Sequence, residues 1–159
     1  MKEFDISIKV KHYALEEMSN ADQQLIEQAI EATKNAYANY SHFYVGAALL
    51  LENGDIVIGA NQENAAFPSS LCAERSAIFA AQSHQPAQPI TTIAIAAKND
   101  RGLLESPITP CGACRQVMLE IEDRYKRPVR VLLYGKVGVY ELQSVRDLLP
   151  LSFVDANMK

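Results

Sequence analysis

The chain has 159 residues, a length typical of one domain, so we expect a single domain over residues 1–159. Its 15 lysines and arginines against 19 aspartates and glutamates give a net charge of −4, whereas nucleic-acid binders usually present a basic face. The N-terminus lacks the pattern of a signal peptide, and no stretch approaches the roughly 18–20 apolar residues of a membrane span. The three cysteines favour metal binding or catalysis in a reducing compartment. We therefore expect a cytoplasmic protein with neither nucleic-acid nor membrane partners.

The first elements along the chain are predicted to be an extended segment, a helix and a hairpin. Apolar residues alternate with polar ones at Phe4, Ile6, Ile8 and Val10, which predicts a short extended segment. A helix is predicted from about residue 21 to residue 38, with Ser19 or Asn20 as its N-cap. Two apolar runs, 43–51 and 56–60, flank an Asn-Gly turn, which is a strong hairpin signal.

The remaining elements alternate between helices and buried strands. Helical spacing predicts a helix over 71–82, a second one over 111–124 after Pro110, and a short one over 145–149. Strands are expected at 91–97, 129–134 and 137–142. This order predicts an α/β fold: a three-layer α/β/α sandwich around one mixed five-stranded sheet.

Three cysteines and a glutamate occur at two predicted helix starts. Cys111 and Cys114 are three residues apart, so both sulfurs can point to one side of a first turn, and Cys72 precedes Glu74 by two residues. Helix N-termini favour thiolates, and three thiolates suit a catalytic Zn²⁺, one per chain, whose fourth position stays open for water. Glu74 is then the candidate general base, and Arg75 is predicted to hydrogen-bond a thiolate sulfur.

Other interpretations of the cysteines are weaker. Free cysteines are often small buried apolar residues, but that does not explain a Cys-x-x-Cys at a helix start together with Cys-Ala-Glu. A thioredoxin-like redox pair leaves Cys72 and Glu74 unexplained. A structural site with three cysteines needs a histidine from His12, His42 or His84, and an iron–sulfur cluster usually needs a fourth cysteine.

Several ordered segments resemble the small cytidine deaminases, in which a ligand-x-Glu segment precedes Pro-Cys-x-x-Cys. The resemblance runs from about Tyr40 to Phe153. It is carried by Tyr40-Ser41-His42-Phe43, Val45-Gly46-Ala47-Ala48, Asn61-Gln62-Glu63-Asn64-Ala65, Cys72-Ala73-Glu74-Arg75, Pro110-Cys111-Gly112-Ala113-Cys114-Arg115-Gln116 and Leu148-Leu149-Pro150. It implies a cytidine deaminase-like fold and a small-molecule nucleoside substrate.

The resemblance also assigns roles in substrate binding. Phe43 would pack against the pyrimidine ring, Asn61 and Glu63 would hydrogen-bond the ribose, and the backbone N–H of Ala73 would meet the base oxygen. It makes His42 a structural hydrogen-bonding residue and not a metal ligand.

Family members are typically homotetramers in which neighbouring subunits complete each pocket. Phe67 and Phe153 match positions that reach into a neighbour's site. Two residues depart from the family pattern: Phe67 stands where Tyr is common, and Tyr44 stands where Pro is common. Both departures bear on fine substrate preference, and neither affects the metal ligands or the base.

The expected reaction is hydrolysis of cytidine, and of 2′-deoxycytidine, to the uracil nucleoside and ammonia in pyrimidine salvage. A zinc-activated water attacks C4, and Glu74 acts as the proton shuttle. A polynucleotide deaminase would need a basic channel for the strand. A deaminase of nucleoside antibiotics would carry the same motifs. A zinc-stabilised binding module without activity would leave Glu74 without a purpose.

Overall fold

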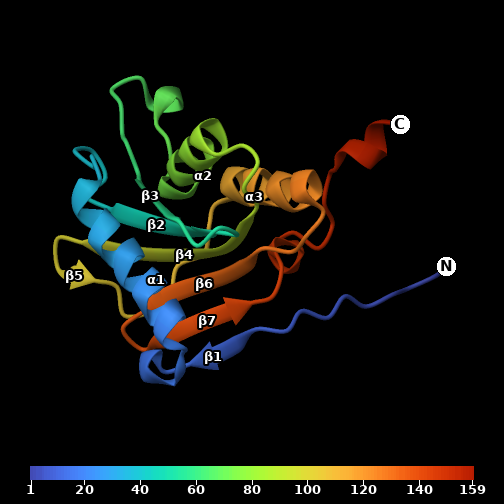
Figure 1. Cartoon of the computed structure of the whole chain (residues 1–159), viewed down its shortest axis with the longest axis horizontal. Helices are drawn as coiled ribbons and strands as arrows, with labels where there is room; N and C mark the ends of the chain where they lie inside the picture. Colours follow the sequence, from blue (N-terminus) through green and yellow to red (C-terminus); the bar gives the residue numbers. More distant parts are fainter.

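A mixed sheet forms the middle layer of the structure, a computed structural model that describes residues 1–159 (Figure 1). Its strands run in the order β1-β7-β6-β4-β2-β3, with β5 paired to β4. Their bounds are β1 (Lys11–Tyr13), β2 (Tyr44–Leu51), β3 (Ile56–Ala60), β4 (Ile90–Asn99), β5 (Gly102–Leu103), β6 (Arg130–Gly135) and β7 (Gly138–Leu142). Only β4 and β6 are parallel; the other pairs are antiparallel.

The sheet has seven strands, so the predicted number of five is wrong, although the α/β class is confirmed. The two additional strands are short: β1 has three residues and β5 has two. Neither length is enough for an alternating pattern to show in the sequence. The alternating segment before β1 lies in no strand and is exposed to solvent.

Helices cover both faces of the sheet, with α1 (Asn20–Ala32) on one face and α2 (Ala73–His84) and α3 (Gly112–Tyr125) on the other (Figure 1). Ser19 caps α1 by accepting a hydrogen bond from the Asp22 N–H at 3.2 Å, as predicted. None of the helices is long and apolar enough to cross a membrane.

The first helix ends earlier than predicted, and residues 33–35 form a 3₁₀ turn. The chain must be extended at Tyr37, because its N–H donates to the Asn61 carbonyl at 2.9 Å and its carbonyl accepts from the Glu63 N–H at 2.8 Å. A helix continuing to residue 38 would instead direct the Tyr37 N–H to the Thr33 carbonyl and so break its pairing with Asn61. The last predicted helix is likewise a 3₁₀ turn, Val145–Leu148.

The central strands contribute alternate residues to two cores. Ala47, Leu49 and Leu51 of β2 face α2 and α3, whereas Ala48 faces α1. The same alternation holds on β4, where Ile93 and Ile95 face one core and Ala94 and Ala96 the other. The small side chains on the α1 face allow that helix to lie close to the sheet.

Gly59 sets the position of α2 on the sheet. A Cβ at this position would lie 2.6 Å from the Ala73 carbonyl oxygen and would also overlap the backbone and side chain of Ala77. Only glycine lets the first turn of α2 approach β3 this closely. The start of α2, with Cys72 and Glu74, is therefore located by backbone contact with the hairpin.

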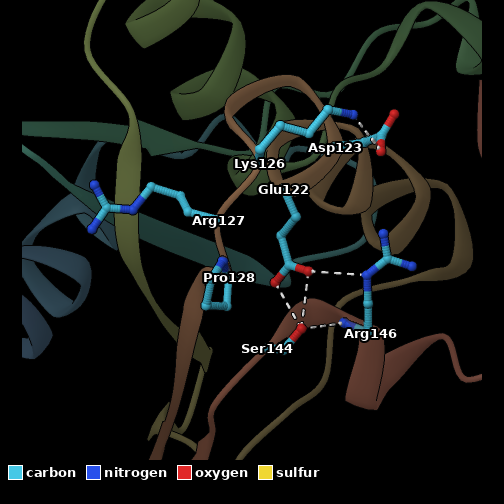
Figure 2. A pocket seen from close by; sticks show the side chains of 7 residues that line it. All are labelled: Glu122, Asp123, Lys126, Arg127, Pro128, Ser144 and Arg146. Atoms are coloured by element: carbon cyan, nitrogen blue, oxygen red, sulfur yellow. Dashed lines mark hydrogen bonds and ion pairs between the residues drawn. The ribbon is translucent and has the colours of Figure 1, made fainter.

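A buried carboxylate fixes the far end of α3. Glu122 accepts hydrogen bonds from the Val129 and Val145 N–H groups at 2.8 and 2.7 Å and from the Ser144 hydroxyl at 2.9 Å. Figure 2 shows the Glu122 carboxylate pointing toward Ser144 and Arg146, and the Arg146 Nε lies 3.8 Å from the carboxylate. Since Val129 precedes β6 and Ser144 follows β7, this one side chain ties α3 to both strands.

Replacing Gly59 by alanine should destabilise the protein by about 1–3 kcal/mol, the usual cost of overpacking a closely packed contact. Thermal and urea unfolding would measure the change. Gly112→Ala serves as the control, because a Cβ at Gly112 meets nothing within 4 Å. Equal stability of the two variants would show that α2 is free to move away from β3.

Candidate active site

The three cysteines meet where α2 and α3 begin. Cys72 is the N-cap residue of α2, Cys111 is the N-cap residue of α3, and Cys114 is fully buried in the first turn of α3. Their Sγ atoms all lie within 4.8 Å of one another, and those of Cys72 and Cys111 are 3.9 Å apart. Zn–S bonds of about 2.3 Å in tetrahedral geometry place sulfurs about 3.8 Å apart, so the cluster fits zinc with one position left open.

The surroundings of the sulfurs shift the pKa values of Cys72 and Cys114 in opposite directions. The neighbouring Cys114 thiol and Arg75, whose Nη2 lies 3.4 Å from Cys72 Sγ, lower the pKa of Cys72 to about 5. The pKa of Cys114 is raised, because its thiol is held by Cys72 and is buried. Although Cys72 and Cys111 are N-cap residues, neither side chain accepts a capping hydrogen bond. The first N–H groups of both helices therefore direct partial positive charge toward the sulfurs.

Glu74 is a carboxyl group almost completely removed from water, with 4% of its surface exposed. Burial raises its pKa above the ordinary value of a glutamate, and the nearby Cys72 thiolate adds to this effect. It lies in the first turn of α2 and lines the same cavity as Cys72 and Cys111. A carboxyl group beside a metal-binding cluster is suited to taking up and returning protons.

The cavity at the cluster has a volume of about 300 Å³, at the lower end of the range for small-molecule sites. It brings together six residues singled out in the sequence: Phe43, Asn61, Glu63, Cys72, Glu74 and Cys111. The remaining lining residues are Ser41, Val45, Ile108 and Thr109. Lysine, arginine and histidine are absent from this lining.

Two of the lining residues also hold the loop that carries Phe43. Asn61 Nδ2 donates to the Phe43 carbonyl at 2.9 Å, and its Oδ1 accepts from the Val45 N–H at 2.8 Å. The Glu63 carboxylate accepts from the Tyr40 and Ser41 N–H groups at 2.7 and 3.2 Å and from the Ser41 hydroxyl. These hydrogen bonds, that from the Ser41 hydroxyl above all, lower the pKa of Glu63.

A pair of backbone hydrogen bonds brings the loop and the cluster together. Gln62 and Leu71 donate to each other's carbonyls, both at 2.9 Å. Because Gln62 lies between Asn61 and Glu63, and Leu71 precedes Cys72, this short bridge places the polar pair beside the first cysteine.

Phe67 and Phe153 lie outside this cavity. Phe67 is 68% exposed and lines a neighbouring cavity of about 400 Å³ with Arg75, and its ring contacts that of Tyr40 edge to face. Phe153 is 59% exposed, and its carbonyl accepts from Gln116. Ala73 is completely buried at the first position of α2.

Residues 19–129 match the family model described as the cytidine and deoxycytidylate deaminase zinc-binding region. The chain belongs to this family. It is 41% identical to the cytidine deaminase of Halalkalibacterium halodurans over 86% of this chain and 96% of that protein. It is 38% identical to the cytidine deaminase of Mycobacterium tuberculosis over 86% and 92%, respectively. A crystal structure of cytidine deaminase from Burkholderia pseudomallei is similar to it, with a TM-score of 0.71 and 40% identity over 86% of this chain and all of that one.

Membership in this deaminase family settles two predictions. The chain is an enzyme of the cytidine deaminase type, and its cofactor is zinc. The cluster of Cys72, Cys111 and Cys114 could hold a metal ion. His42 stands apart from this cluster, in a left-handed backbone conformation with φ of 53°, and its Nδ1 lies 3.5 Å from Asp100.

The two departures from the deaminase pattern occupy different surroundings. Tyr44 begins β2, and its ring lies under the Lys98 ammonium at 5.6 Å from the ring centroid, so the tyrosine has a packing role of its own. Phe67 presents its ring to Tyr40 and to solvent.

Arg115 belongs to the Pro-Cys-x-x-Cys segment of this deaminase, but its sequence context predicts no particular role for it. In the structure, its guanidinium donates to the carbonyls of Pro110 and Leu148, both at 2.8 Å, and to the Thr109 hydroxyl at 3.1 Å. It thereby joins the loop before Cys111 to the C-terminal part of the chain. Its position directly after Cys114 could have drawn attention to it. The hydrogen bond to the Leu148 carbonyl, 33 residues further along the chain, could not be recognised from the sequence.

Arg115→Lys should weaken zinc binding by about ten- to hundred-fold, because lysine cannot make the three forked hydrogen bonds that hold the loop before Cys111. Competition with a chromogenic chelator would measure the affinity. Arg124→Lys is the matched control, the same change on the same helix at an exposed position. Indistinguishable affinities would remove Arg115 from any role at the metal site.

Proposed function

We propose that the chain is a zinc-dependent hydrolytic deaminase of free cytidine and 2′-deoxycytidine, acting as one cytoplasmic domain over residues 1–159 in pyrimidine salvage. The observation that carries this proposal is the buried Glu74 carboxyl beside the Cys72–Cys111–Cys114 cluster, at one shared cavity. The family match supports the reaction class, and the cavity supports a small substrate.

The three cysteine thiolates are the proposed zinc ligands, and Arg75 is the proposed counter-charge. A bound zinc ion would lower the pKa of a water molecule in its open position from about 15.7 to near 7, which supplies hydroxide at neutral pH. Three thiolates and a dication leave a net charge of −1, which weakens the attraction for that hydroxide. Arg75, 3.4 Å from the Cys72 sulfur, offsets part of this negative charge.

Glu74 moves the protons of the reaction. Its carboxylate takes a proton from the attacking water and delivers it to N3 of the cytosine ring, while the water oxygen bonds to C4. It then takes the second proton and passes it to the amino group, so that the C4–N bond breaks and ammonia leaves. One carboxyl group can serve as base and then acid because the transfers occur in turn. Its burial supports this role, since burial raises the pKa above the ordinary value of a glutamate and so lets the carboxyl group hold a proton more readily.

The substrate is proposed to lie between the Phe43 ring and the start of α2. Phe43 packs against the pyrimidine, and the Ala73 N–H, which has no acceptor within its own helix, donates to the base oxygen. Asn61 and Glu63 hydrogen-bond the ribose. Each keeps unused capacity for this, since Asn61 uses one N–H and one lone pair on the loop and the Glu63 carboxylate has further lone pairs.

A neutral nucleoside is favoured over a nucleotide or a polynucleotide. The lining of the cavity includes the Glu63 carboxylate, whose lowered pKa keeps it ionised, and contains no cationic side chain. A phosphate group entering this space would meet a negative charge without a compensating partner.

We also propose that the enzyme is a homotetramer in which Phe67 and Phe153 reach a neighbouring subunit's pocket. Both rings are more exposed than large apolar side chains usually are, at 68% and 59%. Contact with a neighbour would remove them from water.

Glu74→Gln should lower the turnover of cytidine at least about 100-fold while leaving one zinc ion per chain, because glutamine keeps the size of the side chain but cannot carry a proton. The ultraviolet change on conversion to uridine measures turnover, and atomic absorption measures zinc. Glu120→Gln, an exposed position on α3, is the control. Near-normal turnover of the Glu74 variant would contradict the proposed proton shuttle.

The value of kcat/KM for cytidine should exceed that for cytidine 5′-monophosphate by at least about 100-fold, the cost of placing a phosphate in a cavity with a carboxylate and no cation. Initial rates at matched substrate concentrations would give the ratio. Comparable values for both substrates would show that a cation outside this lining, such as Arg75 in the neighbouring cavity or a side chain of a second copy, reaches the phosphate.

A further inference from the structure

The first ten residues form the part of the molecule that the catalytic site does not use. They run away from the body in Figure 1, and all of them are exposed, with the apolar side chains of Phe4, Ile6, Ile8 and Val10 between 42% and 78% exposed. No hydrogen bond or ion pair connects residues 1–10 to the rest of the chain. They lead directly into β1, which pairs with β7 at one edge of the sheet.

The sequence of this segment, residues 3–11, is self-complementary in one antiparallel register. With Ser7 opposite Ser7 of a second copy, Phe4 faces Val10 and Ile6 faces Ile8. On the other face, the central Ser7 pair is flanked only by opposite charges, since Asp5 faces Lys9 and Glu3 faces Lys11. The two-fold axis repeats each contact, which gives four apolar pairs and four ion pairs.

Neighbouring registers lose this match. When the pairing is centred on Ile6, Glu3–Lys9 is the one kind of opposite-charge pair that remains. When it is centred on Ile8, that pair is Asp5–Lys11. Shifting further toward the N-terminus places Asp5 opposite Asp5. A parallel pairing in register puts each charge beside its own copy, which is unfavourable.

We infer that residues 3–11 are a self-association arm that pairs antiparallel with the same arm of a second copy, centred on Ser7. The second copy approaches along the open edge of β1, because β7 occupies the other edge. An isolated two-stranded ribbon is marginal in water, but here each strand continues into β1, which is already held in a seven-stranded sheet. The charge pairs fix the register, and the apolar pairs remove exposed surface from water.

This pairing differs from the proposed contacts of Phe67 and Phe153 around the active site. It uses a segment that precedes residue 19, where the family match begins. It is independent of the proposed catalytic function, and its test does not depend on turnover.

Disulfide trapping tests the register in the full-length, zinc-loaded protein. Ser7→Cys places two thiols on directly opposed residues, whose Cα atoms are about 4.5–5.5 Å apart, within the reach of a disulfide. Asp5→Cys, two residues away on the same face, is the matched control, because its two copies would be about 14 Å apart. After mild oxidation, a non-reducing gel should show a covalent dimer for Ser7→Cys at a yield at least about ten-fold above that of Asp5→Cys and of the unchanged chain.

A charge exchange in the Ser7→Cys background tests the side-chain pairs. Asp5→Lys should lower the dimer yield about ten-fold by placing two lysines opposite each other at both ends of the pair, and adding Lys9→Asp should restore it. Restoration by the double exchange would support direct pairing of residues 5 and 9 between copies. Equal yields for Ser7→Cys and Asp5→Cys, absence of a Ser7→Cys dimer, or no response to the charge exchange would each overturn the inference.

Discussion

The convergence of two helix N-termini on one face of the sheet is the constraint on which the site depends. Helices α2 and α3 pack side by side over the same core, and each begins at a cysteine. A cysteine at the N-cap leaves the first N–H groups of a helix unpaired, so two such ends supply positive potential from two directions. Three sulfurs can gather there only because the close approach of α2 to Gly59 and the anchoring of α3 by Glu122 leave neither helix free to slide.

The substrate side of the cavity is built in a different way, from a loop held by side chains. The Tyr40–Phe43 turn belongs to neither apolar core, and hydrogen bonds to Asn61 and Glu63 hold it. These two residues lie beyond β3 and are tied to the start of α2 by the Gln62–Leu71 bridge. Movement of the loop is therefore coupled to the position of Cys72, and the residues proposed to bind the sugar also determine where the Phe43 ring lies.

The residue types of the site could be predicted from the sequence more readily than the contacts that hold them in place. That Cys72, Glu74, Cys111 and Cys114 come together could be predicted, because zinc ligands and a proton-transfer group require particular residue types at particular spacings from helix starts. The five longer strands and the three helices were recognisable from apolar periodicity.

What the sequence did not reveal depends on contacts between distant segments. The strands β1 and β5 are too short to show a period, and their pairing is set by the neighbours β7 and β4. The end of α1 is determined by the extended backbone pairing of Tyr37, and Arg115 donates a hydrogen bond to the distant Leu148 carbonyl. Ser41 carries no signal of its own, because a serine in a turn is ordinary until Glu63 is found beside it.

Two carboxyl groups, Glu63 and Glu74, line one cavity, and their surroundings shift their pKa values in opposite directions. Glu63 accepts three hydrogen bonds on an exposed loop, and these lower its pKa, so that it stays ionised and can accept further hydrogen bonds from hydroxyl groups. Glu74 is buried beside a sulfur cluster, and burial raises its pKa. Three thiolates with one dication would add a net charge of −1 next to it, which again favours the protonated form. Opposite pKa shifts of this kind suit the two proposed roles, because a carboxylate with a lowered pKa keeps its charge, whereas a carboxyl group with a raised pKa holds a proton more readily. The difference between their pKa values follows from burial, hydrogen bonding and nearby charges, since the two side chains are chemically identical.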